Sequence, residues 1–200
     1  MADRTISNRS SLAGLANPGS LGAATGNPGV RIREITEFAA LAVIARRGCA
    51  SEVAAVLAHH VGSPIADAAK RAEGAALSVT GTAPGQWLVV ERGGSRNEVE
   101  RVRAELSEIA AVTDQGDGRL IIEMSGARAR DALAKGIAID LDASVFKIGD
   151  AAQTSAAHIG LQIALLDETP TFEIISARST AESFWSWLVA SAAEYGIEVV

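Results

Sequence analysis

From residue 30 onward, apolar and polar positions follow two periods, one typical of strands and one typical of helices. Residues 30–35, VRIREI, alternate apolar and charged side chains, which predicts a half-buried strand. Residues 48–62 place Val53 and Leu57 at helical spacing, and Gly62 is a favourable end for a helix. The elements expected next are strands at 75–81 and 86–92, a helix that begins at the Ser-Arg-Asn-Glu capping box at 95–98, and a strand at 110–115. This β-α-β-β-α-β order is that of the ferredoxin-like module.

The second half of the chain repeats this order more loosely. The elements expected there are a strand at 118–126, a helix at 127–135, a short strand at 137–141, two strands within 155–179, a helix at 180–195 and a strand at 197–200. The sequence therefore predicts an α+β protein of two tandem ferredoxin-like (split βαβ) modules, with antiparallel-rich sheets and helices on one face. We expect the first module at 30–115 and the second at 116–200, packed with the first as one unit.

Residues 1–29 differ in composition from the rest of the chain. They are rich in Gly, Ser, Asn and Ala, and Asn-Pro-Gly occurs twice, at 17–19 and 27–29. Such turn-rich and weakly apolar sequence predicts a flexible N-terminal arm. A second interpretation is that Leu12, Leu15 and Leu21 allow the arm to lie on a partner protein.

Composition narrows the class of function. The 200 residues carry a net charge of −6 and only 4% aromatic residues, so they offer neither a basic face nor a stacking platform for nucleic acid. The chain has a single cysteine, Cys49, which favours a reducing compartment. No apolar run reaches the roughly 18 residues of a spanning helix, so we expect no membrane association and a cytoplasmic protein.

The segment 113–136, TDQGDGRLIIEMSGARARDALAKG, concentrates acids, arginines and glycines and is the first candidate for a binding site. An EF-hand loop needs a glutamate at position twelve, but the twelfth position from Asp114 is Ser125. A metal loop is therefore not expected. The pattern instead predicts a turn between two strands, in which Asp114, Asp117 and Arg119 hold the junction of the two modules.

A phosphate-binding interpretation of the same segment is weaker. In a P-loop the lysine follows a glycine, whereas here Lys135 precedes Gly136. An anion could bind at the helix that follows Ser125, near Arg128 and Arg130. The preferred interpretation is that Ser125 caps this helix and Lys135 complements its dipole.

Other residues with reactive side chains do not form a recognisable catalytic motif. His59 and His60 are adjacent on a helix, so their side chains point about 100° apart and cannot jointly bind a metal. Cys49 lies near a predicted helix N-terminus, where a thiol is activated, which leaves a free-standing thiol enzyme as an alternative. We expect no catalytic, cofactor-binding or metal-binding residue on this chain.

The helix expected at 180–195 carries an aromatic cluster. Phe184 and Leu188 share its apolar stripe with Tyr195, and Trp185 flanks the stripe. Trp187 points elsewhere. It is either covered by another element of this chain or used at an interface.

Three segments together resemble the gamma subunit family of heterotetrameric sarcosine oxidases. They are Thr-Asp-Gln-x-Asp-Gly-Arg at 113–119, Ala-Arg-Asp-x-Leu-Ala-Lys-Gly at 129–136, and the segment 178–188 that ends in Phe-Trp-x-Trp-Leu. The resemblance covers roughly residues 10–200. It adds Arg130, Asp131, Arg178, Trp185 and Trp187 to the expected interface or structural residues.

The resemblance implies a non-catalytic structural subunit with a fold similar to the folate-binding domain of the glycine-cleavage aminomethyltransferase. Holoenzymes of this family oxidatively demethylate sarcosine to glycine, with production of hydrogen peroxide and a one-carbon unit that passes to tetrahydrofolate. FAD, FMN, NAD and zinc are implied on the alpha, beta and delta subunits, which are the expected partners. The alternative is a free-standing domain that binds folate or an amino acid in a cleft between the modules.

Overall fold

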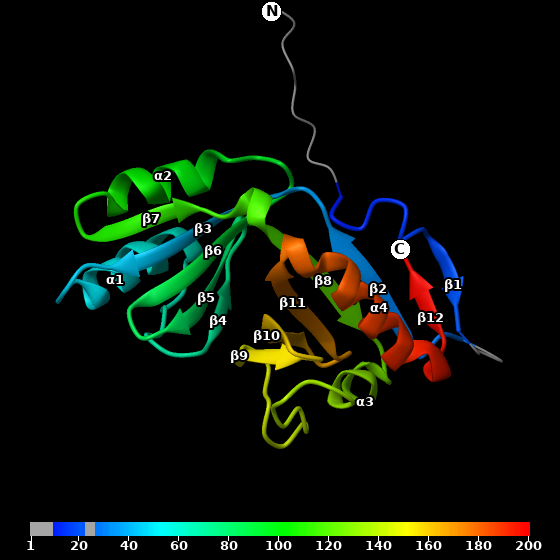
Figure 1. The fold of residues 1–200 in the computed structure, drawn as a ribbon. Helices are drawn as coiled ribbons and strands as arrows, with labels where there is room; N and C mark the ends of the chain where they lie inside the picture. The colour runs from blue at the N-terminus through cyan, green and yellow to red at the C-terminus, as the bar shows by residue number, and fades with distance from the viewer. Residues whose placement is uncertain (1–9, 23–26) are drawn as a thin grey trace, which may run out of the picture.

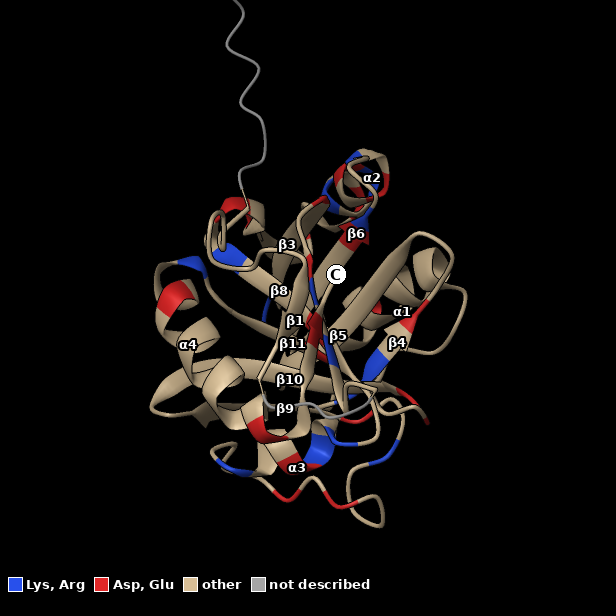
Figure 2. Ribbon diagram, turned by 90° about the vertical axis from the view of Figure 1, so that its right-hand side faces the viewer, with Lys and Arg blue, Asp and Glu red and all other residues tan. Residues whose placement is uncertain are grey.

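The structure is a computed structural model that describes residues 10–22 and 27–200 (Figure 1). In these residues the strands form one five-stranded and one seven-stranded sheet. The sheets lie face to face, and helices cover the outer face of each, with α1 and α4 on opposite sides of the molecule (Figure 2). The predicted α+β class with two ferredoxin-like modules is confirmed.

The five-stranded sheet carries the first ferredoxin-like module. Its elements are β3 (Phe38–Ala45), α1 (Ala50–Val61), β4 (Arg71–Glu73), β5 (Leu77–Ala83), β6 (Gln86–Arg92), α2 (Asn97–Leu106) and β7 (Ala110–Asp114). The strand order is β4-β5-β6-β3-β7, and neighbouring strands are antiparallel. Without the short edge strand β4, the order is that of a split βαβ module, with β3 between β6 and β7.

The seven-stranded sheet carries the second module and two additional strands. The module consists of β8 (Arg119–Ser125), α3 (Ala129–Ala134), β9 (Ala151–Ala156), β10 (Ile159–Asp167), β11 (Thr171–Ala177), α4 (Ala181–Ala192) and β12 (Ile197–Val199). The additional strands are β1 (Gly19–Leu21) and β2 (Val30–Ile35). The order is β1-β12-β2-β8-β11-β10-β9.

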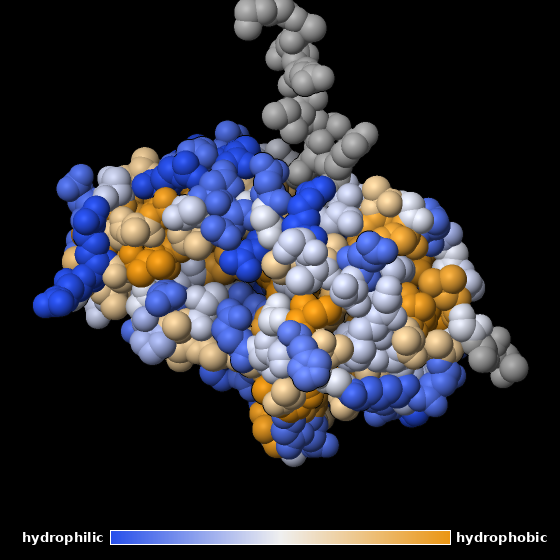
Figure 3. Space-filling view, viewed as in Figure 1, coloured by the Kyte–Doolittle hydropathy of each residue, from blue (hydrophilic) through white to orange (hydrophobic). Residues whose placement is uncertain are grey.

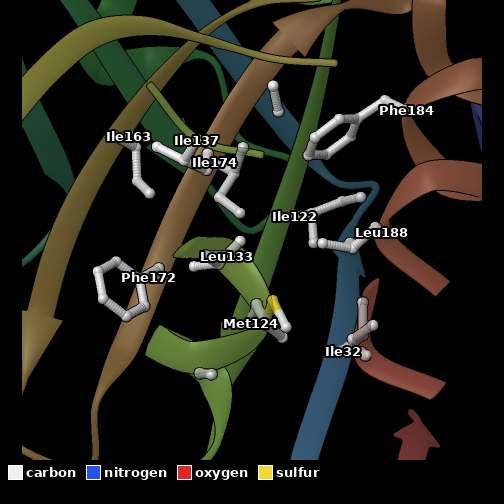
Figure 4. Packing of buried hydrophobic residues seen from close by; sticks show 14 of the residues in the cluster. Ile32, Ile122, Met124, Leu133, Ile137, Ile163, Phe172, Ile174, Phe184 and Leu188 are labelled. Atoms are coloured by element: carbon white, nitrogen blue, oxygen red, sulfur yellow. The ribbon is translucent and has the colours of Figure 1, made fainter. Parts of the chain in front are cut away.

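Each sheet buries a core beneath its own helices. Under α3 and α4, Ile122, Met124, Phe172, Phe184 and Leu188 belong to one buried cluster (Figure 4). A second cluster lies under α1 and α2, where valine and leucine side chains of the five-stranded sheet are buried. Burial of this apolar surface is the main favourable contribution to folding of each module. No helix in the described ranges is long and apolar enough to cross a membrane.

Residues 30–35 form a strand as predicted, but the strand belongs to the other sheet. We expected it to open the first module, whereas β2 pairs parallel with β12 and antiparallel with β8. Ile32 is fully buried in the core of the second module. Alternation shows that one face of a strand is buried but carries no information on its neighbours, so the expected position was wrong.

The strand that opens the first module is β3, which we did not predict. Its sequence, FAALAVIA, is a continuous apolar run without alternation. Ala39 and Leu41 face the helices of the first module, while Phe38 and Ala40 face the other sheet. A strand that is buried on both faces has this pattern, which periodicity alone does not distinguish from a helix.

Residues 10–22 of the expected flexible arm pack on the second module. Leu12 is 1% exposed within the second core, and β1 pairs with β12. The amide of Ser11 donates to Glu34 of β2 at 2.8 Å. The expectation of a free arm is therefore wrong for these residues, because a single buried leucine and edge-strand pairing are enough to order them. Residues 1–9 and 23–26 lie outside the described residues.

Two further expectations for the second module need correction. Residues 137–141 do not form a strand, and Ile137 makes only an isolated bridge to Ala156. The helix expected at 127–135 begins at Ala129, after Arg128, so Ser125 is the last residue of β8 and does not cap the helix.

Candidate functional site between the two sheets

The space between the two sheets is where polar side chains of both modules meet. Side chains alternate along each strand, so one face of a strand contacts the helices and the other contacts the opposite sheet. On β8, Leu120 and Ile122 lie in the core under the helices, whereas Ile121 contacts residues of the other sheet. Glu123 continues the row of Ile121 and forms an ion pair with Arg92 of β6. The space between the sheets is therefore lined by the alternate side chains of each strand that face the opposite sheet.

A small apolar cluster forms the centre of this space. Its buried members are Phe38, Ala40, Leu88, Val90, Ile121 and Ile175, drawn from β3 and β6 of one sheet and β8 and β11 of the other. The cluster is much smaller than the cores under the helices. Polar groups occupy the remaining area, so the contact between modules resembles a partly polar interface more than a continuous core.

Beside the cluster, a network of ion pairs crosses from one sheet to the other. Glu173 of β11 is 1% exposed and accepts from Arg71 Nε at 2.9 Å and from Arg92. Arg92 also bonds Glu123, which in turn accepts from Arg33 Nε of β2 at 3.2 Å. Arg71 and Arg92 belong to the first module and the two glutamates to the second. The network therefore joins the modules through charge-assisted hydrogen bonds.

The charges of this network stabilise each other. Burial lowers the pKa of Arg71 and Arg92, but Glu173 acts on both, and Glu123 on Arg92, so that their pKa values are raised. Burial raises the pKa of Glu123, but hydrogen bonds and charge from Arg33 and Arg92 outweigh it and hold this pKa below its ordinary value. The charged forms of Arg71, Arg92 and Glu123 are thereby favoured, which suits a structural contact between the modules.

At the other end of the inter-sheet space lies a cavity of about 320 Å³. Its walls come from β3, β5 and β6 of the first module and from β8 to β11 of the second. The polar side chains that line it are Thr82, Gln86, Arg119, Gln153, Thr154 and Gln162. The cavity is partly open, since Ile44 on its wall is 48% exposed.

Two of these polar groups lack partners within the described residues. Gln162 is 5% exposed, and its Oε1 accepts from Gln153 Nε2 at 3.3 Å, but its Nε2 has no hydrogen-bond partner in the described chain. The Nε of Arg119 is likewise buried and unpaired among these residues. A buried donor without a partner costs about 1–3 kcal/mol, so both groups favour a ligand or ordered water in the cavity.

The three residues expected at the module junction lie at different places. Asp114, at the end of β7, is ion-paired with Arg96, which immediately precedes α2, and with Arg103 in that helix. Burial raises its pKa, but the amide of Gly116 and the two guanidinium groups outweigh this and lower the pKa. Asp117 is exposed in the short 3-10 helix Gly116–Gly118. Arg119 is the member of the three that lines the inter-sheet cavity.

Arg130 and Asp131 are both on α3 but have different surroundings. The guanidinium of Arg130 donates to the carbonyl oxygen of Leu141 and lies 5.3 Å from the ring centre of Phe172. It therefore holds the loop after α3 against the sheet. Asp131 is exposed and forms an ion pair of 3.0 Å with Arg128, three residues earlier.

The two tryptophans of α4 are covered to different extents by this chain. Trp185 is 6% exposed within the second core. Trp187 is half-buried, with its ring 5.7 Å from that of Phe184, and an added Cβ on Gly136 would lie 2.9 Å from it. The turn after α3 therefore covers part of Trp187, which was expected either to be covered by this chain or to lie at an interface. Arg178 lies in the 3-10 helix before α4.

Cys49 and His60 lie at opposite ends of α1 and contact different neighbours. Cys49 immediately precedes α1, and its Sγ donates to the carbonyl oxygen of Arg47 at 3.9 Å. The His60 side chain lies between Glu98 and Glu105 of α2, at 3.4 and 3.3 Å. His60 therefore links the two helices of the first module. Within residues 10–22 and 27–200, no three His, Cys, Asp or Glu residues are grouped to hold a metal ion.

The inter-sheet residues were not identified from the sequence. Glu173, Arg71 and Gln162 have no motif around them. A weak signal is present, because Glu173 and Gln162 interrupt the apolar runs TFEIISA and IGLQIALL, where a polar side chain needs a buried partner.

The chain is similar to known proteins in sequence and in structure. Residues 47–194 match the sarcosine oxidase, gamma subunit family. No curated protein sequence matches the chain. A chain of the heterotetrameric sarcosine oxidase from Corynebacterium sp. U-96, in complex with pyrrole 2-carboxylate, has a similar structure, with a TM-score of 0.79 and 24% identity over 94% of this chain and 95% of that one.

A second solved structure is similar at lower identity. It is the glycine cleavage system aminomethyltransferase T from Bartonella henselae, with a TM-score of 0.61 and 14% identity. The match covers 86% of this chain and 47% of the aminomethyltransferase. At these identities the structural likenesses establish a shared fold.

Proposed function

Because the chain belongs to the sarcosine oxidase gamma subunit family, we propose that it is a non-catalytic structural subunit of a heterotetrameric sarcosine oxidase. The observation that carries this proposal is the family match over residues 47–194. The shared fold with a chain of the Corynebacterium enzyme, over nearly the whole length of both chains, supports it. The holoenzyme would demethylate sarcosine oxidatively to glycine, with hydrogen peroxide and a one-carbon unit for tetrahydrofolate as the other products.

The interior of the molecule supports a structural role. Two charges with little solvent exposure, Glu173 and Arg71, pair with each other across the two sheets. Such pairs keep two modules in one arrangement but do not supply a nucleophile or a general base. In this proposal FAD, FMN, NAD and zinc are held by the alpha, beta and delta subunits, and the assembled enzyme is cytoplasmic.

One exposed loop offers a surface for a partner subunit. Val145 and Ile148, in the loop between α3 and β9, are 55% and 53% exposed. Phe146 between them is buried and stacks on Phe172, with ring centres 6.4 Å apart, so the loop is fixed to the module. Figure 3 shows the apolar projection at the lower edge, where Figure 1 places this loop. Two exposed apolar side chains on an anchored loop are suited to a protein contact.

Co-expression tests the proposal directly. The chain would carry an affinity tag and be produced together with the alpha, beta and delta subunits of the same organism. We expect the four chains to co-purify in equal amounts and the complex to release peroxide from sarcosine. The tagged chain alone should release none.

Two results would contradict this proposal. If the chain purified alone from the co-expression, the assignment as a subunit would be wrong, and a free-standing domain would be the better interpretation. If the isolated chain oxidised sarcosine, the non-catalytic role would be wrong even if assembly were confirmed.

A further inference from the structure

We propose that the cavity between the two sheets is a binding site for a small monocarboxylate with an apolar body, held by Arg119 and Gln162. The proposal rests on the composition of the cavity and on its unpaired polar groups. It does not rest on the proposed role as a subunit, because the residues that carry it all belong to this chain.

The charge of the cavity wall selects an anion. Arg119 is the cation among the described lining residues, and no aspartate or glutamate is among them. Elsewhere between the sheets, Arg71 and Arg92 are paired with glutamates. No hydrogen bond or ion pair of the Arg119 side chain is found in residues 10–22 and 27–200, and its Nε is buried. A guanidinium that is partly removed from water without a counter-charge attracts a carboxylate, whose two oxygens match its paired donors.

Gln162 supplies a second donor from β10 of the same sheet, which β11 separates from the β8 strand of Arg119. Its side chain is held by the hydrogen bond from Gln153, which leaves the Nε2 group unpaired. At 5% exposure this donor has little access to bulk water. Nε2 therefore favours an acceptor inside the cavity. A carboxylate offers enough lone pairs to accept from both side chains.

The apolar side chains of the wall determine which chemical group the carboxylate of the ligand can carry. Leu88 and Ile175 line the cavity from the apolar inter-sheet cluster, and Ile44 lies on the open side. The volume of about 320 Å³ is at the small end of ligand pockets, which hold compact organic molecules. An aromatic or branched aliphatic acid has the required size, one charge and an apolar body.

Titration calorimetry on the full chain tests this site, with sodium benzoate as the probe and benzamide as its neutral counterpart. At low ionic strength we expect saturable binding of benzoate at one equivalent. Benzamide should bind about tenfold or more weakly, because it lacks the charge that Arg119 recognises.

Variants locate the site. Arg119→Gln should weaken benzoate binding about tenfold to a hundredfold, and Gln162→Leu about tenfold. The matched control is Arg101→Gln, which removes the same charge from an exposed position on α2, on the other face of the five-stranded sheet. It should bind benzoate as the unchanged protein does. Circular dichroism checks that each variant is folded.

Several results would overturn the proposal. Absence of benzoate binding, or equal binding of benzoate and benzamide, would do so without any variant, and so would an equal loss of binding in Arg101→Gln and Arg119→Gln. The carboxylate could also come from an aspartate or glutamate of a partner subunit. If the isolated chain bound benzoate and the assembled complex did not, the site would belong to the partner's side chain, and the assignment to a small ligand would be wrong.

Discussion

At the scale of single residues, the charges between the sheets were the features least visible in the sequence. Glu173 lies in the middle of an apolar strand, and its partner Arg71 lies 102 residues earlier in the chain. A helix pair at i and i+4 can be found from spacing, but a pair across two sheets requires the tertiary arrangement. Arg119 was predicted as a junction residue from its neighbours, yet its position in a cavity could not be derived from them.

Glu173→Gln should strongly destabilise the protein. The change leaves Arg71, whose side chain is 4% exposed, and the half-buried Arg92 without the carboxylate that they share. Removal of one partner from a buried ion pair costs about 3–5 kcal/mol, and we expect a loss in this range. Denaturant unfolding measures it.

The matched control for this change is Glu198→Gln. Glu198 pairs with Arg31 at the surface, where their side chains are 36% and 60% exposed. Because water screens such a pair, we expect a loss of at most about 1 kcal/mol. If the two variants lost equal stability, the inter-sheet network would not be a significant tie between the modules.

At the scale of elements, amphipathic helices were predicted well, and so was the end of the first helix at Gly62, whereas the N-terminal caps were not. The helix expected at 48–62 is observed as α1, Ala50–Val61, because its apolar stripe faces a core. The prediction of a capping box at 95–98 was wrong. The amide of Val99 in α2 donates to Glu91 of β6 at 2.9 Å, while Ser95 accepts from the amide of Asn97. A cap supplied by a different element has no local sequence signal.

Gly136→Ala should destabilise the contact between the turn after α3 and helix α4. An added Cβ would lie 2.9 Å from Trp187, closer than carbon atoms pack. We expect a loss of about 1–3 kcal/mol in unfolding free energy, as for other overpacked sites. In a Trp187→Leu background the same change should cost at least about 1 kcal/mol less, and a double-mutant cycle measures this coupling.

Gly160→Ala is the matched control for this prediction. Nothing lies within 4 Å of a Cβ added at Gly160, so its effect should stay within about 0.5 kcal/mol. Additive effects of Gly136→Ala and Trp187→Leu would mean that the ring moves away at no cost and that the turn does not position Trp187.

At the scale of the whole molecule, the repeated order of elements was enough to predict two modules, but not how they combine. The second module recruits β2 between its first and last strands, and β1 extends the sheet beyond β12. These contacts join the start of the chain to its end, and a repeat pattern within each half does not encode them. The face-to-face arrangement of the sheets follows from the inward rows of the strands, which the sequence shows only as polar interruptions in apolar runs.

The prediction about assembly with other subunits also concerns the whole molecule. Val145→Asp combined with Ile148→Asp should reduce co-purification with the other subunits about tenfold or more, because charged side chains would replace the apolar centre of the contact. The isolated chain should remain within about 0.5 kcal/mol of its original stability, since both side chains are exposed. Val200→Asp is the control, because Val200 is 47% exposed at the C-terminus, away from this loop (Figure 1). If Val200→Asp impaired assembly and the loop variant did not, the partner would bind beside β12, and the loop would not be part of the interface.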